Sequence, residues 1–101
     1  MEKIKEISIV EETEEIKEDD SQYNVILYND DVTPFDFVIA VLMTVFNYNF
    51  QQAASLTLHV HQNGSAIVAT LSMEAAYAKV EEVDQMNEQW GFLLQTNVEK
   101  A

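Results

Sequence analysis

Three consecutive polar residues, Asn29, Asp30 and Asp31, form the group in this chain that is best suited to chemistry. An amide oxygen and two carboxylates accept hydrogen bonds and add negative charge, so they suit a positively charged ligand. The same residue types are typical of a turn, because they bond to nearby backbone and tolerate turn dihedrals. The spacing of acidic residues that builds a calcium loop is missing. A simple turn and a cation-binding turn both agree with these residues.

Two histidines, His59 and His61, form the second group. In a strand they would share a face and could hold a metal ion, whereas in a helix a rotation of about 200° separates them. The surrounding segment has helical character, so a joint metal site is not predicted, and a single histidine near a helix end is typical of a surface group. The chain has no Cys, and it lacks the motifs of metalloproteases, phosphate-binding loops and nucleophile elbows. We therefore expect no enzyme, no metal site and no cofactor.

Composition narrows the class of partner. The 101 residues fit one small domain, and 18 acidic residues against five lysines give a net charge of −13. Nucleic acid is excluded as an expected partner, because its phosphates are bound by basic residues. The start of the chain resembles neither a secretory signal nor a transit peptide, and no apolar run approaches the roughly 18 residues that predict a membrane span. We expect a cytoplasmic protein that contacts neither membrane nor nucleic acid and that favours cationic partners.

The elements that must position these groups begin after an acidic segment. Residues 1–22 hold nine acidic residues and three lysines and few apolar side chains, which predicts a mobile N-terminal extension followed by a folded domain at 23–101. Within that domain Thr33 is predicted to cap a helix with Pro34 at its first position. The predicted order is βααβαβ, with elements at residues 23–29, 34–46, 50–61, 65–71, 73–90 and 92–99. One sheet covered by helices gives a two-layer α+β domain.

Four segments in one continuous order resemble the ClpS family, the bacterial N-end rule adaptors of Clp ATPases. They are YNVILYNDDVTPFDFVIAVL, LHVHQNGSAIV, SMEAAYAKVEEV and LLQTNVEKA. The resemblance implies a monomer with three helices and a three-stranded antiparallel sheet, similar to the C-terminal domain of the ribosomal stalk protein. It also implies a non-catalytic function, in which proteins that begin with Leu, Phe, Tyr or Trp are bound and delivered to the N-domain of a ClpA- or ClpC-type unfoldase for degradation.

The resemblance assigns roles to individual residues. Asn29, Asp30 and His61 would surround the free α-amino group of the substrate. An ammonium group has three donors and a positive charge, and an amide oxygen, a carboxylate and a neutral imidazole offer three acceptors. Asp31 and Thr33 would support the turn. The remaining implied residues are the hydrophobic pocket, Phe35, Val38, Thr57, Val60 and Leu93 or Leu94, and the unfoldase contact, Glu74 and Lys79.

Two pocket positions depart from the family pattern. Phe35 stands at a gating position where Met is common, and Thr57 stands where a Met often lines the pocket. A stiffer ring at the gate predicts stronger rejection of β-branched residues and a preference that shifts toward aromatic ones. The alternative hypothesis is a regulator that binds the unfoldase without reading N-degrons. A stalk-like ribosomal domain is disfavoured by the acidic turn and the Val60-His61 pair.

Overall fold

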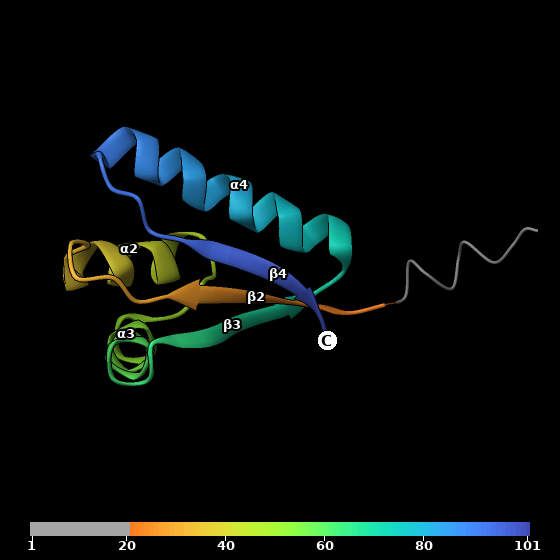
Figure 1. The fold of residues 1–101 in the computed structure, drawn as a ribbon, viewed down its shortest axis with the longest axis horizontal. Coiled ribbons are helices and arrows are strands. Elements are labelled where there is room, and N and C mark those ends of the chain that lie inside the picture. The colour runs from red at the N-terminus through yellow and green to blue at the C-terminus, as the bar shows by residue number, and fades with distance from the viewer. Residues whose placement is uncertain (1–20) are drawn as a thin grey trace, which may run out of the picture.

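The computed structural model of the protein describes residues 21–101 (Figure 1). The predicted extension at 1–22 lies outside the described residues, apart from its last two. In chain order the elements are β2 (Tyr23–Tyr28), α2 (Phe35–Thr44), α3 (Phe50–Asn63), β3 (Ser65–Leu71), α4 (Met73–Trp90) and β4 (Thr96–Lys100). This is the predicted order of strands and helices.

The sheet has β2 at its centre, paired antiparallel with β3 on one side and β4 on the other. Within β2 the side chains of Val25 and Leu27 are fully buried, while the residues between and beside them are half-buried, as expected for a strand with one face toward the core. Helix α4 lies across the sheet and contacts all three strands, and α2 and α3 pack against each other near one end of it (Figure 1). The predicted α+β fold with a three-stranded antiparallel sheet and three helices is confirmed.

The start of α2 differs from the prediction. The helix begins at Phe35, and Pro34 is its N-cap with extended dihedrals, φ −67° and ψ 149°. The Thr33 side chain does not cap the helix. Its hydroxyl donates to the Asp30 carboxylate instead, at 2.7 Å. The free backbone groups at the start of a helix are N–H donors, whereas the Asp30 carboxylate is a charged acceptor for the hydroxyl proton, and the Thr33 side chain is oriented toward that carboxylate.

Helix α3 has well-defined ends. Asn49 and Gln52 form a capping box, in which the Asn49 side chain accepts from the Gln52 amide at 2.8 Å and the Gln52 side chain accepts from the Asn49 amide at 3.1 Å. Gly64 ends the helix in the left-handed conformation, φ 89°, which glycine adopts without a steric penalty. The Gly64 carbonyl then accepts from the Asn29 amide at 2.9 Å. This bond joins the end of α3 to the acidic turn.

Helix α4 is capped by Ser72, whose hydroxyl accepts from the Ala75 amide at 3.2 Å. The helix buries a narrow stripe that consists of Ala76, Val83 and Asn87. Two aromatic residues of α4, Tyr77 and Trp90, lie outside this stripe and are 56% and 62% exposed. Tyr77 follows Ala76 and so points about 100° away from it, and Trp90 is the last helical residue.

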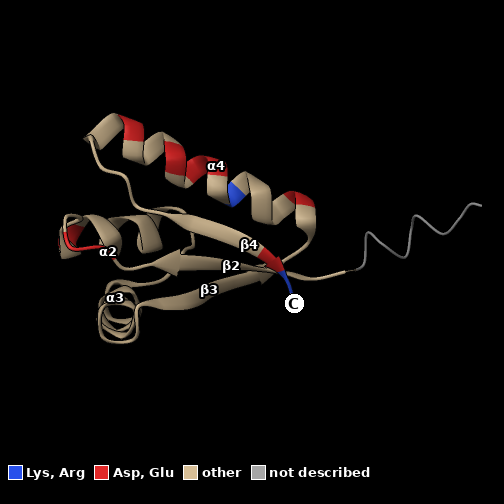
Figure 2. Ribbon diagram, in the orientation of Figure 1, with Lys and Arg blue, Asp and Glu red and all other residues tan. Residues whose placement is uncertain are grey.

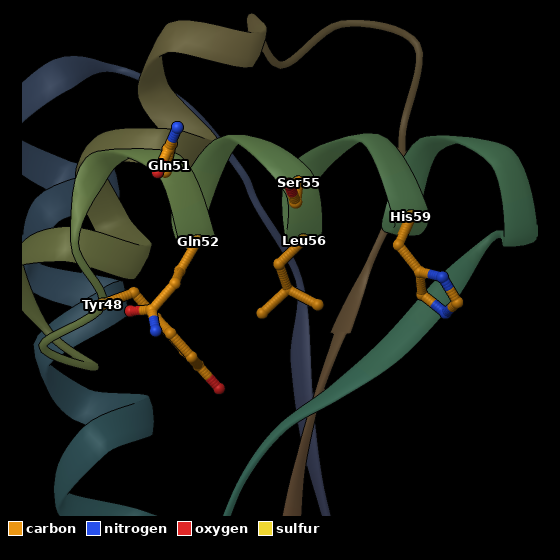
Figure 3. A pocket seen from close by; sticks show the side chains of 6 residues that line it. All are labelled: Tyr48, Gln51, Gln52, Ser55, Leu56 and His59. Atoms are coloured by element: carbon orange, nitrogen blue, oxygen red, sulfur yellow. The ribbon is translucent and has the colours of Figure 1, made fainter.

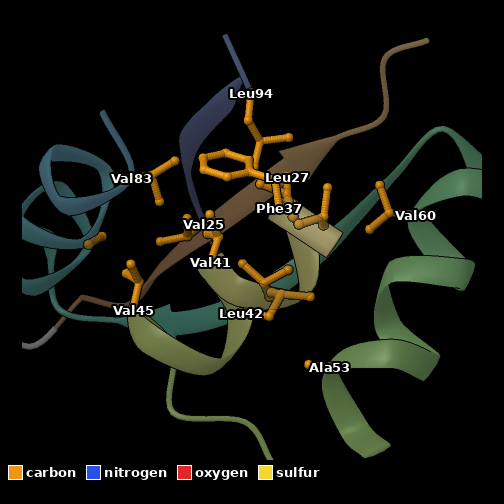
Figure 4. Packing of buried hydrophobic residues seen from close by; sticks show 13 residues of the cluster. Val25, Leu27, Phe37, Val41, Leu42, Val45, Ala53, Val60, Val83 and Leu94 are labelled. Atoms are coloured by element: carbon orange, nitrogen blue, oxygen red, sulfur yellow. The ribbon is translucent and has the colours of Figure 1, made fainter. Parts of the chain in front are cut away.

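The last strand is shorter than predicted. Residues 92–95 precede β4, which begins at Thr96. Both backbone groups of Leu94 bond to the side chain of Asn87 in α4, so they are not available to the sheet. The Leu94 side chain nevertheless enters the core beside Leu27 and Phe37 (Figure 4).

Candidate functional site

The acidic turn is organised by the carboxylate of Asp30. Its Oδ1 accepts from the amides of Val32 and Thr33, at 2.8 Å and 2.6 Å, and its Oδ2 accepts from the Thr33 hydroxyl. Burial acts to raise the pKa of the Asp30 carboxyl, but the bonds from the Thr33 hydroxyl and the two amides outweigh it, and the net pKa lies below the ordinary value of 3.8. Asp30 therefore stays ionised, and it both builds the turn and keeps a negative charge there.

His61 reaches the same region from the last turn of α3. Its exposed ring lies against the ring of Phe35, with 5.1 Å between the ring centroids and an angle of 69° between the planes. Phe35 is the first residue of α2 and is 43% exposed. This half-exposed position agrees with the gating position that the resemblance implies for Phe35. His59 lies on the same helix but contributes to a different surface. Its ring Nδ1 lies 3.2 Å from the side-chain Nδ2 of Asn63.

A narrow cavity lies beneath Phe35. It is lined by Tyr28, Asn29, Asp30, Thr33, Phe35, Val38, Thr57, Val60 and Leu94, and its volume is about 10 Å³. This space corresponds to about one water molecule. Most of the predicted α-amine, turn and pocket residues are thus brought together in one place, with polar groups from the turn at one side and buried apolar groups at the other.

The structure distinguishes between the two candidate leucines. Leu94 is 3% exposed and lines the cavity, whereas Leu93 is 84% exposed and lies outside it. Leu93 lines an adjoining groove of about 380 Å³ together with Val32 and Phe92. The groove and the cavity share Tyr28, Asn29, Asp30 and Thr33. Of the predicted pocket residues, only Leu93 is therefore placed outside the cavity.

Thr57 does not offer a free donor to the cavity. Its buried hydroxyl donates to the carbonyl of Ala53, one turn earlier in α3, at 2.7 Å. The hydroxyl that Thr57 has in place of a methionine side chain is thus already bonded within the helix. The cavity wall formed by Val38, Thr57 and Val60 is buried and has no charged group.

The charge on the molecule is segregated. No Asp, Glu, Lys or Arg lies between Asp36 and Glu74, so α3 and β3 carry none (Figure 2). The acidic turn and the start of α2 carry Asp30, Asp31 and Asp36. The described part of the chain, residues 21–101, has two cations, Lys79 on α4 and Lys100 at the end of β4. The acidic turn therefore presents a negative potential with no positive side chain among its cavity-lining neighbours, which favours a cationic ligand.

The remaining predicted residues lie elsewhere. Asp31 is exposed on the turn and does not line the cavity. Glu74 is exposed in the first turn of α4, and Lys79 is half-buried on the same helix with its Nζ 3.9 Å from the Glu82 carboxylate. Neither residue lines the cavity.

A larger hollow lies elsewhere on the molecule. It measures about 730 Å³ and is lined by Tyr48, Gln51, Gln52, Ser55, Leu56 and His59. Figure 3 shows Gln52, Leu56 and His59 along one side of α3. This hollow shares no residue with the cavity under Phe35 and is lined by no Asp, Glu, Lys or Arg, so we assign it no binding role.

Two contributors to the site were not predicted. Tyr28, the last residue of β2, lines the cavity, and Asn87 holds the backbone of Leu94. A signal for Asn87 exists in the sequence. Val83 lies seven residues after Ala76 and Asn87 lies four residues after Val83, so a polar residue stands at helical spacing in an apolar stripe. Within residues 21–101 no cluster of three or more His, Asp or Glu could hold a metal ion, and none of the helices there is long and apolar enough to cross a membrane.

The fold and the site define a small binding domain, in which hydrogen-bond acceptors adjoin a narrow apolar cavity. The family described as "ATP-dependent Clp protease adaptor protein ClpS" matches residues 18–97, and the chain belongs to this family. That description is of a protease adaptor and not of a protease.

Individual relatives agree with the family assignment. The ClpS protein of Xanthomonas oryzae pv. oryzae is 44% identical over 66 residues, which are 65% of this chain and 62% of the relative. The ClpS protein of Campylobacter jejuni subsp. jejuni is 42% identical over 78 residues, 77% of this chain and 81% of the relative. The chain thus matches somewhat less than two thirds of the Xanthomonas protein. The solved structure of Agrobacterium tumefaciens ClpS2 bound to L-phenylalaninamide is similar with a TM-score of 0.76 and 32% identity, over 80% of this chain and 98% of the other.

Proposed function

We propose that this protein is a non-catalytic adaptor that binds N-degrons and delivers them to a Clp AAA+ unfoldase for degradation. Each N-degron would be held by its free α-amino group and its bulky apolar first side chain. The observation that carries the proposal is the placement of Asn29 and Asp30 on the wall of a cavity whose other side is apolar, with His61 against its rim at Phe35. A substrate would need both features, because neither contact alone offsets the cost of association.

The α-amine would be bound at the polar side of the site. Asp30 supplies the charge, since its pKa lies below the ordinary value and its carboxylate is held in place by the turn. The Asn29 amide donates to the Gly64 carbonyl at the end of α3, which holds the backbone of Asn29 in place beside the cavity. A neutral His61 would accept from the ammonium at the exposed edge. Hydrogen bonds to a charged group contribute about 1.5–3 kcal/mol each.

The first side chain would be bound in the cavity under Phe35. A volume of about 10 Å³ does not hold a leucine or phenylalanine side chain, so the cavity must widen when it binds one. Phe35 is the residue most free to move, because it is the only apolar side chain of the lining that is more than a third exposed. L-phenylalaninamide, with which the Agrobacterium relative was solved, combines a free α-amine with a benzyl side chain, and this supports the same class of ligand here.

Delivery to the unfoldase would involve residues outside the cavity. We propose that Glu74 and Lys79 on α4 contact the N-domain of a ClpA- or ClpC-type ATPase, and that the acidic segment 1–22 assists the handover. The domain at 23–101 would act as a cytoplasmic monomer that contacts neither membrane nor nucleic acid. The charge of −13 supports the last point, because phosphate backbones repel such a chain.

The second candidate is a regulator that binds the unfoldase without reading N-degrons. The small volume of the cavity favours it, since a site that never opened would bind no side chain. The two candidates differ in whether the isolated protein binds peptides that begin with a free, bulky apolar residue.

The test is a fluorescence-anisotropy titration with one peptide that begins with Phe, prepared free and N-acetylated. Acetylation removes the charge and two of the three donors, so we expect affinity to fall by a hundredfold or more, given about 1.5 kcal/mol for each of two lost bonds. His61→Ala should weaken the free peptide by about tenfold, and His59→Ala is the matched control that should not, because both are exposed histidines of α3. Equal affinity for the two peptides would reject the amine site, and no binding of either would favour the regulator.

A further inference from the structure

Asn87 is a buried polar residue that the proposed binding of a substrate does not use. It lies in the last turn of α4 and is 8% exposed. Its side-chain Nδ2 donates to the Leu94 carbonyl at 2.9 Å, and its Oδ1 accepts from the Leu94 amide at 3.0 Å. Its own carbonyl accepts from the amides of Gly91 and Phe92, at 2.8 Å and 3.0 Å. One residue thus makes four hydrogen bonds to the segment 91–94.

The two side-chain hydrogen bonds of Asn87 take the place of the backbone bonds that a neighbouring strand would make to Leu94. A residue in a sheet exchanges one donated and one accepted bond with its partner, and the Asn87 amide offers Leu94 the same two groups. An aliphatic residue would be the ordinary choice at this position, since Ala76 and Val83 occupy the rest of the buried stripe. An aliphatic side chain would leave the buried amide and carbonyl of Leu94 without these partners, which is costly.

The two side-chain bonds of Asn87 are made to Leu94, the leucine that faces the cavity. Successive side chains of an extended segment point in opposite directions, so a slip of one residue would exchange Leu94 for Leu93. Leu94 is 3% exposed and Leu93 84% exposed, which is the result of the present alignment. The neighbouring contacts support this alignment but are further from Leu94. The Gln95 carbonyl accepts from the Tyr28 amide at 3.1 Å, and the Phe92 ring lies 4.7 Å from that of Phe37.

We propose that Asn87 is a specificity-determining positioning residue, which sets how well the adaptor discriminates among first side chains by holding Leu94 as a wall of the cavity. This inference rests on the proposed function. Asn87 itself lies outside the lining of the cavity and acts through Leu94. It therefore affects the recognition of the first side chain and leaves the recognition of the α-amine, at Asn29 and Asp30, unchanged.

The experiment compares two affinity ratios in the full chain. The first is the ratio for Phe-initiated over Ala-initiated peptides, which reports the pocket, and the second is the ratio for free over N-acetylated Phe peptides, which reports the amine site. Asn87→Leu keeps the size of the side chain and removes both bonds to Leu94. We expect the first ratio to fall by at least fivefold and the second to stay within twofold. Gln89→Ala, at an exposed amide of the same helix, is the control and should change neither ratio.

A purely structural role for Asn87 predicts a different result. If both ratios fell together, or if neither moved in a folded variant, the proposal would be overturned. If Asn87→Leu does not fold, Asn87→Asp takes its place, because it keeps an acceptor for the Leu94 amide and loses the donor for the Leu94 carbonyl. Amide hydrogen exchange of Leu94 adds a readout without ligand. Faster exchange in either variant than in Gln89→Ala would support the role of the Asn87 bonds in holding Leu94. This readout holds even if the wild type binds no peptide, and in that case the proposed function fails and the role of the bonds does not.

Discussion

Replacing Asp30 separates the two tasks that its carboxylate performs. In Asp30→Asn the Oδ1 atom still accepts from the amides of Val32 and Thr33, and the Thr33 hydroxyl can reverse to accept from the new Nδ2 group. The turn is therefore kept and the charge is lost. In Asp30→Ala all three bonds are lost together with the charge. We expect both variants to bind free-amine peptides weakly, and only Asp30→Ala to unfold markedly more easily.

The contacts of the turn set the magnitudes. A hydrogen bond contributes about 0.5–1.5 kcal/mol net, and the lower half of that range applies here because the turn is partly exposed and water can replace the lost partner. Three bonds then correspond to about 2 kcal/mol of unfolding free energy for Asp30→Ala, and Asp30→Asn should lose less than about 1 kcal/mol. A charged acceptor binds an ammonium about 1.4 kcal/mol more strongly than a neutral one, so Asp30→Asn should lose about tenfold in affinity. Asp30→Ala, which has no acceptor, should lose at least as much.

The pH dependence of stability provides a second measure. Because the pKa of Asp30 in the folded protein lies below its ordinary value of 3.8, its bonds stabilise the fold fully above pH 3.8 and are lost as the pH falls further, through the folded pKa. The stability difference between the wild type and Asp30→Ala, measured by urea denaturation, should therefore be constant from pH 7 to about pH 5 and shrink below pH 3.8.

The affinity of each Asp30 variant for the free Phe peptide is measured by fluorescence anisotropy at pH 7. Thr33→Val is the matched control, since it removes the hydroxyl bond and keeps both the Asp30 charge and its two amide bonds, and it should bind the free Phe peptide within about threefold of the wild type. If Asp30→Asn bound this peptide as tightly as Thr33→Val does, the charge of Asp30 would have no part in binding, and the reasoning from the turn would be refuted.

Two further predictions concern the cavity. Phe35→Ala removes the ring that lies over it, so in competition assays peptides that begin with Ile or Val should gain severalfold relative to Phe, and an unchanged ranking would show that Phe35 does not limit access. Leu94→Ala should lower the unfolding free energy by about 2–5 kcal/mol in urea titrations, because the side chain is buried, whereas Leu93→Ala should change it by less than about 0.5 kcal/mol. Equal losses for the two leucines would contradict the alignment of residues 92–95.

Local chemistry made much of the fold predictable from the sequence. The run YNVILY has the β-branched and aromatic residues of a strand, and Gly64 and Gly91 end their helices because each adopts a positive φ that other residues resist. Ser72, directly before α4, caps it with its hydroxyl, which is a typical role of serine at that position. These features depend on neighbours in the chain, so the element order follows from the sequence. The motif around Asn29 and Asp30, together with the Val60-His61 pair, indicated the family that the comparison then confirmed.

Competition between partners decided what the sequence left open. The Thr33 hydroxyl could accept from an amide of the first turn of α2 or donate to the Asp30 carboxylate, and it makes the charge-assisted bond to Asp30. Leu94 had a strand and a helical asparagine available as partners, and Asn87 took both of its backbone groups, which delayed β4 to Thr96.

The sequence by itself thus determined the order of elements, the acidic turn and the family. Only the tertiary structure decided that Leu94 and not Leu93 faces the cavity, that Phe35 lies against His61, and that the cavity is nearly closed. The physical reason is that side-chain direction in a short extended segment reverses with a shift of one residue, and such a shift is set by bonds to residues on another element. No local pattern in LLQT specifies that alignment.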